Sequence, residues 1–298
     1  MHGEDSPQNP RMDDGVSDDL RGLVAESGPT RRKFLGVSAA LGVAAAVGGV
    51  SRGASASEPS ESGAPEAQPG DATGMSVAVM VFDRITQLDA TAPIEVFAKA
   101  GWTVFTVAPE RRLVRAGSGL KIMPDYDYES APEADVLCVP GGGGVNPLLT
   151  DAATLDYVRA AASTATYVTS VCTGALILGA AGLLKGKRAT THWASHHFLK
   201  SLGAIPVKER VVVDGNLITG GGVTAGVDFA FTVLDEVLGR DAAALVMLAL
   251  EYDPAPPFVG GVPGNTAEGI VESYGAAAAG SLDQRGKQVE AAAAALAV

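Results

Sequence analysis

From Met75 onward, short apolar runs alternate with segments whose apolar residues recur at helical spacing. Four of these runs contain apolar residues with few or no charged side chains, which is typical of strands buried on both sides: 76–82, 102–108, 134–140 and 166–171. Strands buried on both sides pair in parallel and are joined by helices that cover the sheet. The pattern therefore predicts an α/β fold, a doubly wound, mostly parallel sheet with helices on both faces.

The segments between these runs predict the other elements of the fold. Helical spacing predicts helices over the ranges 88–100, 147–162 and 173–183, and one or two helices over 224–251. Residues 113–128 predict an irregular or antiparallel excursion, because Pro124 breaks their short alternation. Residues 188–203 predict a short strand and a helix. A hairpin turning at Asp214-Gly215 is expected within 207–222.

The N-terminal region, residues 1–56, has the features of an export signal. Its first 29 residues are polar and acidic, which predicts disorder. Arg31 and Arg32 then precede an Ala/Gly-rich apolar run and a small-residue cleavage motif ending at Ala56, the ordered parts of a twin-arginine (Tat) signal. We expect export by the Tat machinery to the periplasm, cell envelope or exterior, with membrane contact only during export. An uncleaved anchor is the alternative, although the run is short for a bilayer.

The remaining chain divides by composition. Residues 57–74 predict a linker, 75–266 a single folded domain without internal repeats, and 267–298 an Ala/Gly-rich tail that can form a helix but has little to bury. The net charge of -12, without a basic stripe, argues against nucleic-acid binding.

Cys172 occupies a place where a reactive side chain is expected. It follows the strand 166–171 and precedes a helix, with Ser170 and Gly174 as the small neighbours that a nucleophile elbow requires. The helix amino terminus predicts a reactive, exposed thiol with a lowered pKa. An inert buried cysteine is the alternative, and it is the better interpretation of Cys138 within its strand. A disulfide between the two is not expected, because their surroundings differ.

Further candidates follow other strands, whose carboxyl ends form the ligand site in doubly wound folds. Asp89 could hydrogen-bond the sulfur or transfer a proton, although an ordinary acid at a helix amino terminus is the alternative. Gly141, Gly142 and Gly143 offer N–H groups to a developing negative charge, although glycine turns after strands are common.

The histidines are not expected to be catalytic. A cysteine nucleophile usually has a histidine base, but Thr173 follows Cys172, and we expect His192 to be structural or to line the pocket. His196 and His197 have no ligand spacing and are predicted to lie on the surface. The sequence carries no metal signature, and we predict no cofactor.

Taken together, these residues resemble the ThiJ/PfpI superfamily, whose members have a flavodoxin-like fold of the class I glutamine amidotransferase type. The likeness extends from about Met75 to Phe258. Its landmarks are FDRITQLDATAPIEVF, DVLCVPGG, SVCTGALILGAAGLLKGKRATTHW, LITGGGVTAGVDFA and EYDPAPPF. The combination is most similar to the isonitrile hydratase branch. The resemblance implies a homodimer and a cysteine-dependent hydro-lyase that converts a small-molecule isonitrile and water into an N-substituted formamide.

Carried over by position, the resemblance implies that Cys172 is the nucleophile and Thr173 the neighbouring hydroxyl. It also implies that Asp89 and Asp253 are acid/base carboxylates. From the residues alone, Asp253-Pro254 indicates only a turn that ends a helix.

The sequence argues against two other functions of the superfamily and leaves two alternatives open. Thr173 stands where protease-like members have histidine, which argues against peptide hydrolysis. AraC-type regulators share this domain but add DNA-binding helices, whereas the residues after Asp253 are Ala/Gly-rich and the chain has an export signal, so a transcriptional role is not expected. A thiol redox sensor or small-molecule binding protein, and a glyoxalase-like enzyme acting on dicarbonyls, remain as alternatives.

Overall fold

The computed structural model describes residues 74–297. The predicted export signal, the N-terminal disorder and almost the whole 57–74 linker lie outside these residues. Within them, no helix combines the length and the apolar character needed to span a bilayer.

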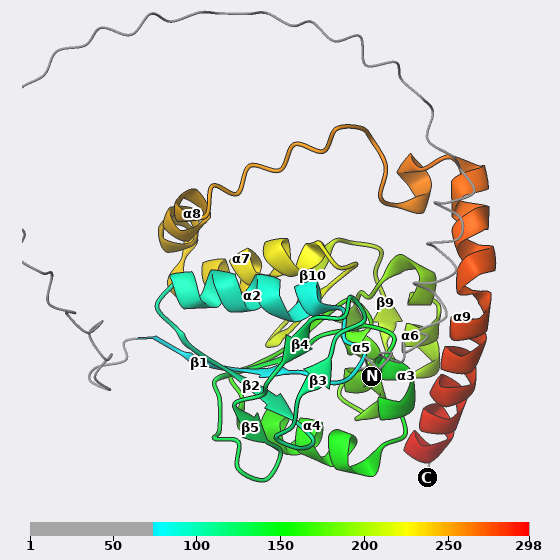
Figure 1. The fold of residues 1–298 in the computed structure, drawn as a ribbon, viewed down its shortest axis with the longest axis horizontal. Helices are drawn as coiled ribbons and strands as arrows, with labels where there is room; N and C mark the ends of the chain where they lie inside the picture. Colours follow the sequence, from blue (N-terminus) through cyan, green and yellow to red (C-terminus); the bar gives the residue numbers. More distant parts are fainter. Residues whose placement is uncertain (1–73, 298) are drawn as a thin grey trace, which may run out of the picture.

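A seven-stranded sheet in the order β10-β11-β7-β6-β1-β2-β5 forms the centre of the fold (Figure 1). Its strands are β1 (Ser76–Met80), β2 (Thr103–Ala108), β5 (Tyr126–Asp127), β6 (Val136–Val139), β7 (Tyr167–Val171), β10 (Val211–Asp214) and β11 (Leu217–Gly220). All neighbours pair in parallel except β10 and β11, which form the predicted hairpin after Asp214. The mostly parallel sheet is confirmed.

Helices cover both faces of this sheet, as predicted (Figure 1). On one face α2 (Gln87–Lys99) packs against α7 (Ala225–Leu238), and α8 (Arg240–Ala249) follows after Gly239, whose φ is 83°. On the other face lie α4 (Ala152–Thr164) and α5 (Gly174–Ala180). The short helices are α3 (Val145–Leu148), α6 (Phe198–Ser201), η1 (Trp193–Ser195) and η2 (Pro263–Asn265).

Two small strand pairs lie outside the main sheet. β3 (Val114–Arg115) and β4 (Lys121–Ile122) are antiparallel and confirm the expected excursion, although β5 from the same region joins the main sheet in parallel. β8 (Arg188–Ala189) pairs in parallel with β9 (Ile205–Pro206).

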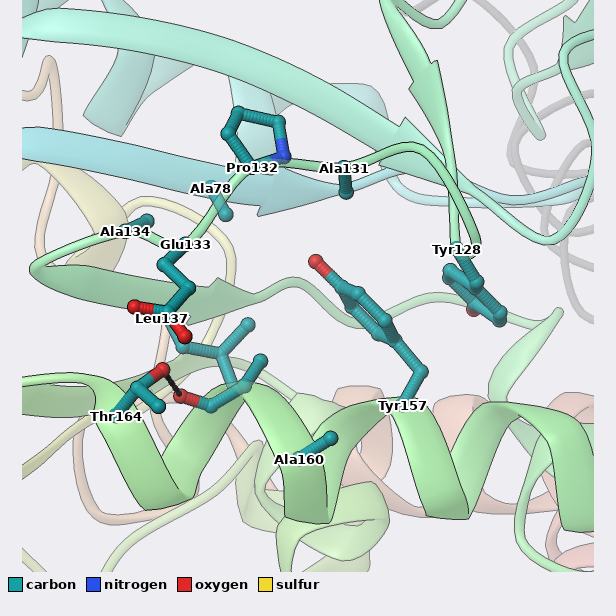
Figure 2. A pocket seen from close by; sticks show the side chains of 11 residues that line it. Ala78, Tyr128, Ala131, Pro132, Glu133, Ala134, Leu137, Tyr157, Ala160 and Thr164 are labelled. Carbon is teal, nitrogen blue, oxygen red and sulfur yellow. Dashed lines mark hydrogen bonds between the residues drawn. The ribbon is translucent and has the colours of Figure 1, made fainter.

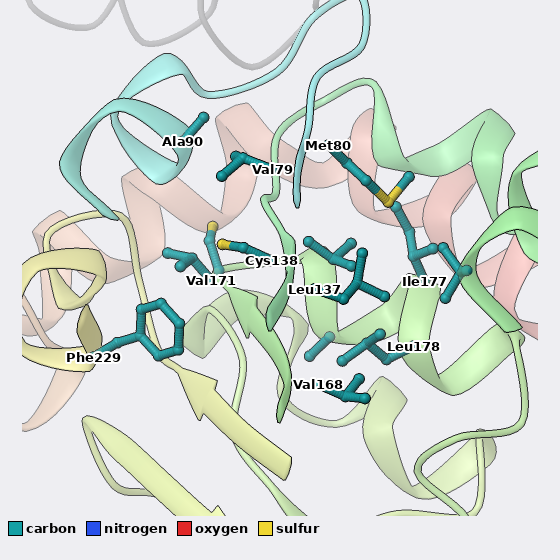
Figure 3. Packing of buried hydrophobic residues seen from close by; sticks show 14 of the residues in the cluster. Val79, Met80, Ala90, Leu137, Cys138, Val168, Val171, Ile177, Leu178 and Phe229 are labelled. Carbon is teal, nitrogen blue, oxygen red and sulfur yellow. The ribbon is translucent and has the colours of Figure 1, made fainter. Parts of the chain in front are cut away.

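The core lies between the sheet and its helices. Figure 3 shows Leu137, Val168 and Val171 of the strands among Leu178 of α5 and Phe229 of α7. All five are buried, which is why nearly uniform apolar runs identified these strands from the sequence. On the α2 face, Phe97 stacks on Trp102 with ring centroids 5.1 Å apart and meets the edge of Phe229.

The single helix predicted over 147–162 is wrong. The chain forms α3 and then α4, and Asp151 between them has an extended backbone. The Asp151 carboxylate accepts a hydrogen bond of 2.8 Å from the Thr154 backbone N–H. An aspartate that satisfies a free N–H in this way begins a helix, so the first helix stops before it.

The C-terminal segment forms one long helix, α9 (Glu268–Leu296), which packs against α5, α6 and α3 (Figure 1). Its buried side chains lie along one side of the helix, at intervals of seven, four and three residues: Ala278, Arg285, Val289 and Ala292. The expectation that this segment has little to bury is wrong, because this side of the helix packs against the domain.

Candidate active site

Cys172 lies on a sharp turn between β7 and α5. Its φ of 56° is in the left-handed region, which is uncommon for residues other than glycine and is held here by the surroundings. The Cys172 N–H donates to the Gly220 carbonyl at 3.1 Å, and its carbonyl accepts from the Thr191 hydroxyl at 2.7 Å. The predicted nucleophile elbow is therefore present.

Small neighbours are required at this turn. A Cβ on Gly174 would lie 1.9 Å from the Val139 carbonyl oxygen, so only glycine lets the start of α5 come this close to β6. Ser170, two residues before the cysteine, is fully buried. The sequence pattern identified the turn because both constraints act on residue size.

Asp89 in the first turn of α2 reaches the same place. Its side chain is fully buried, and Oδ2 accepts a hydrogen bond of 3.0 Å from the Gly141 N–H. The other oxygen, Oδ1, is buried without a nitrogen or oxygen hydrogen-bond donor among residues 74–297, and the carboxyl group interacts with the Cys172 thiol. Burial raises the pKa of Asp89 to about 7, against the lowering effect of these two contacts. Asp89 can therefore gain or lose a proton near neutral pH.

The Cys172 thiol is buried, with only 5% of the residue exposed. Burial raises its pKa well above the usual value, the negative charge of Asp89 raises it further, and the Thr173 backbone and Arg285 oppose the shift. The expectation of an exposed thiol with a lowered pKa is thus wrong. The seven-residue helix α5 does not offset the loss of water around the sulfur. The thiol is protonated at rest and needs a base.

The glycine loop after β6 holds the acid and the elbow in place. The Gly141 N–H binds Asp89, and the Gly142 N–H donates to Thr173 Oγ1 at 3.0 Å. A Cβ on Gly141 would lie within 3 Å of both Thr173 and Asp89. Because both N–H groups are already engaged, their role here is positioning rather than the predicted contact with a developing charge. Gly143 faces the Arg84 guanidinium, 3.1 Å from the place of a Cβ.

His192 forms part of an aromatic cluster beside the elbow. Its ring lies 6.2 Å from Tyr274 and 5.8 Å from Trp193, and its Nδ1 accepts from the Ala194 N–H. Burial, and then the charge of Arg285, lower the pKa of His192 to about 4. The imidazole is therefore neutral at physiological pH and already accepts a hydrogen bond, which fits the predicted structural or pocket-lining role.

Two residues of α9 reach this site and were missed from the sequence. Tyr274 packs on Trp193 with ring centroids 5.0 Å apart. Arg285 is 7% exposed and donates to Ser195 and Asn146. The charge of Cys172 affects the pKa values of both side chains. Their spacing of eleven residues, three helical turns, places them on one side of α9 and was the signal available in the sequence.

The structure does not bring Asp253 to this site within one chain. It is exposed after α8, and its N–H donates to Glu251, as in the turn indicated by the residues alone. Its catalytic role stays a prediction. Cys138 is fully buried and both cysteines are free, so the predicted absence of a disulfide agrees with the structure. His197 is exposed, whereas His196 is half-buried and binds the Val207 carbonyl through Nε2.

A separate pocket of about 170 Å³ lies between α4 and the segment 128–134 (Figure 2). The stacked rings of Tyr128 and Tyr157, 4.2 Å apart, form part of its wall. It shares no lining residue with the cysteine site. Within residues 74–297, no group of three or more histidine, cysteine or acidic side chains is arranged to hold a metal ion.

Known proteins share this arrangement of sequence and fold. Residues 75–236 match the model of the DJ-1/PfpI family. The chain is 51% identical over 223 residues to isonitrile hydratase from Pseudomonas putida, an alignment that covers 74% of this chain and 98% of that protein. A crystal structure of a ThiJ/PfpI family protein from Pseudomonas syringae superposes with a TM-score of 0.70 at 35% identity, covering 77% of this chain and 98% of the other.

A more distant likeness concerns a regulator. The chain is 26% identical over 199 residues to the HTH-type transcriptional regulator GbdR from Pseudomonas aeruginosa. That alignment covers 64% of this chain but only 54% of the regulator.

Proposed function

Because this chain belongs to the DJ-1/PfpI family, we propose that it hydrates isonitriles, converting R–N≡C and water into an N-substituted formamide. The buried pair of Asp89 and Cys172 at the elbow carries this proposal. It lies in a chain that shares half of its aligned residues with an isonitrile hydratase. A protonated thiol beside a carboxyl group whose pKa is near 7 can deliver both a nucleophile and a proton to one carbon atom.

The first half of the proposed reaction is an addition to the terminal carbon. The sulfur of Cys172 bonds to this carbon, while the thiol proton passes to Asp89 and from there to the same carbon. The product is a thioimidate, R–N=CH–S–Cys172, which contains all atoms of the isonitrile and of the thiol. Asp89 is again ionised at the end of this step.

The second half is hydrolysis of the thioimidate. Asp89 takes a proton from water as the hydroxyl bonds to the carbon, and this proton is transferred to the nitrogen. The carbon–sulfur bond then breaks, the hydroxyl proton returns to the sulfur, and the formamide R–NH–CHO leaves. One water is consumed and the thiol is restored. Thr173 keeps its hydroxyl on the glycine loop, so we assign it a positioning role.

Of the two alternatives, the redox sensor fits the site less well. A redox sensor needs an accessible thiolate, whereas Cys172 is buried and its pKa is raised. A glyoxalase-like reaction also uses a cysteine and an acid, so it is separated by assay rather than by geometry.

Formamide production tests the proposal. The chain from Ser57, incubated with a simple alkyl isonitrile and no added thiol, should yield the matching N-alkylformamide, which chromatography detects. Lactate from methylglyoxal without formamide from the isonitrile would reject isonitrile hydration and favour the glyoxalase-like alternative. If neither formamide nor lactate forms, the hydratase proposal loses its main support.

The pH dependence of kcat/KM should report the Asp89–Cys172 pair. The reaction starts from the form in which the pair holds one proton, and below pH 7 the pair holds two. We therefore expect kcat/KM to fall about tenfold per pH unit below an apparent pKa near 7 and to be level above it. Rates from pH 5 to 9, with protein folding checked at each pH, measure this. A flat profile across pH 7 would contradict the role of Asp89.

We also propose export and dimer formation. The twin arginines and the cleavage motif ending at Ala56 support export, and a mature amino terminus near Ser57 outside the cytoplasm would test it. Exposed apolar side chains support a homodimer, among them Leu245 and Leu248 of α8 and Phe258 and Val259 after it. Light scattering of the purified protein tests this state.

A further inference from the structure

Arg285 is a buried cation that has no anionic partner of its own among residues 74–297. Its guanidinium donates from Nε to Asn146 Oδ1 at 2.9 Å and from Nη1 to Ser195 Oγ at 2.6 Å, and both acceptors are neutral. No carboxylate of residues 74–297 forms an ion pair with it. Charged side chains this deeply buried are normally paired, because removing a lone charge from water is costly. A compensating negative charge is therefore expected nearby.

The hydrogen bonds of Arg285 connect it to the cysteine elbow through the segment 191–195. Ser195 belongs to the same short segment as Thr191, whose hydroxyl binds the Cys172 carbonyl. The same segment presents His192 and Trp193 to Tyr274, three turns before Arg285 on α9. The segment 191–195 thus joins α9 to the elbow, and Cys172 and Tyr274 are the acidic groups whose charges act on Arg285.

The charges around Cys172 can be balanced group by group. Burial raises the pKa of Tyr274, so its hydroxyl is neutral at pH 7, and the pKa of about 4 keeps His192 neutral. Cys138, with a pKa of about 12, is also neutral. The Asp89–Cys172 pair carries one negative charge when it holds one proton. Arg285 is the cation whose charge acts on Cys172 among the described residues.

We propose that Arg285 is a positioning residue that supplies the counter-charge for the single negative charge shared by Asp89 and Cys172. The inference deepens the proposed function and rests on it for its catalytic meaning. The positive charge of Arg285 and the single negative charge of the Asp89–Cys172 pair add up to zero. Burying the active form of the pair therefore costs less free energy than burying a lone negative charge. The C-terminal helix then becomes part of the active site.

Alkylation of Cys172 tests this without any isonitrile. The rate of reaction with iodoacetamide, followed on the Cys172 peptide by mass spectrometry, is measured against pH for the wild type, Arg285→Gln and Arg285→Lys. Gln keeps donors for Ser195 and Asn146 but loses the charge, and Lys keeps the charge. In Arg285→Gln the midpoint of the alkylation profile should move upward by about one pH unit, whereas in Arg285→Lys it should stay near the wild type.

Two further variants keep the result interpretable. Gln288→Ala removes a neighbouring contact of α9, the hydrogen bond to Thr150, without changing charge, and should leave the midpoint unchanged. Arg285→Met is a second neutral variant in case Arg285→Gln does not fold. An unshifted midpoint in a folded neutral variant would overturn the proposal, as would equal shifts in the Gln and Lys variants. Absence of formamide with the expected alkylation shift would instead reject only isonitrile hydration.

Discussion

Replacing Cys172 with alanine should reduce formamide production by at least about 10⁴-fold, because no covalent adduct can form without the nucleophile. Cys138→Ala is the matched control. It removes the other buried thiol from the same sheet, one strand away, and should keep activity within a few-fold of the wild type. Initial rates of formamide formation measure both variants, with circular dichroism to confirm folding. Equal loss in both variants would indicate damage to the core rather than loss of chemistry.

Asp89→Asn should remove most of the activity and also stabilise the protein at alkaline pH. The asparagine oxygen can still accept the Gly141 N–H, but it cannot carry a proton between sulfur and carbon, so we expect a loss of about 10²- to 10⁴-fold in kcat. The fall of kcat/KM below pH 7 should also disappear in this variant. Residual activity that keeps this limb would show that another group controls the titration.

The stability effect of the same variant depends on pH in a defined direction. The folded-state pKa of Asp89, about 7, lies above the ordinary value of 3.8, so folding is favoured by protonation. This contribution is fully present below pH 3.8 and is lost as the pH rises through 7. Asparagine has no such loss, so the advantage of the variant should grow from under about 1 kcal/mol at pH 4 to about 4 kcal/mol at pH 8.

Urea unfolding of wild type and variant at several pH values measures this difference directly. Asp253→Asn is the matched control, because it makes the same chemical change at an exposed carboxylate. A constant difference between the Asp89→Asn variant and the wild type from pH 4 to 8 would contradict the raised pKa of Asp89.

Much of the fold followed from the sequence because its strands are buried on both sides. The runs that became β1 and β6 are almost wholly apolar, and β7 adds only small hydroxyl side chains to its valines and tyrosine, which leaves few other structures open to them. The break between α3 and α4 was missed because apolar spacing continues across it, while the capping by Asp151 is a local hydrogen bond. The tail was misjudged because Val289 is the one large apolar residue among the buried residues described in α9, beside two alanines and Arg285, and this combination gives a weak periodic signal.

The sequence predicted the position of the candidate site better than it predicted the pKa of the Cys172 thiol. Cys172 and Asp89 were found because each follows a parallel strand, and such ends meet at one edge of the sheet. The pKa of the thiol depends on groups far away in the sequence, and Arg285, whose charge acts on Cys172, comes from α9 near the end of the chain. The exposed, low-pKa thiol expected from the elbow alone was therefore wrong, and Arg285 was not recognised.

Trapping the covalent intermediate tests the central claim most directly. Wild-type protein mixed with an alkyl isonitrile is quenched in acid within the first turnovers, digested and analysed by mass spectrometry. We expect the Cys172 peptide to gain the mass of one isonitrile molecule, with no such gain on the Cys138 peptide and none in Cys172→Ala. Formamide production at the wild-type rate in Cys172→Ala, without an adduct on any cysteine, would contradict nucleophilic catalysis by Cys172.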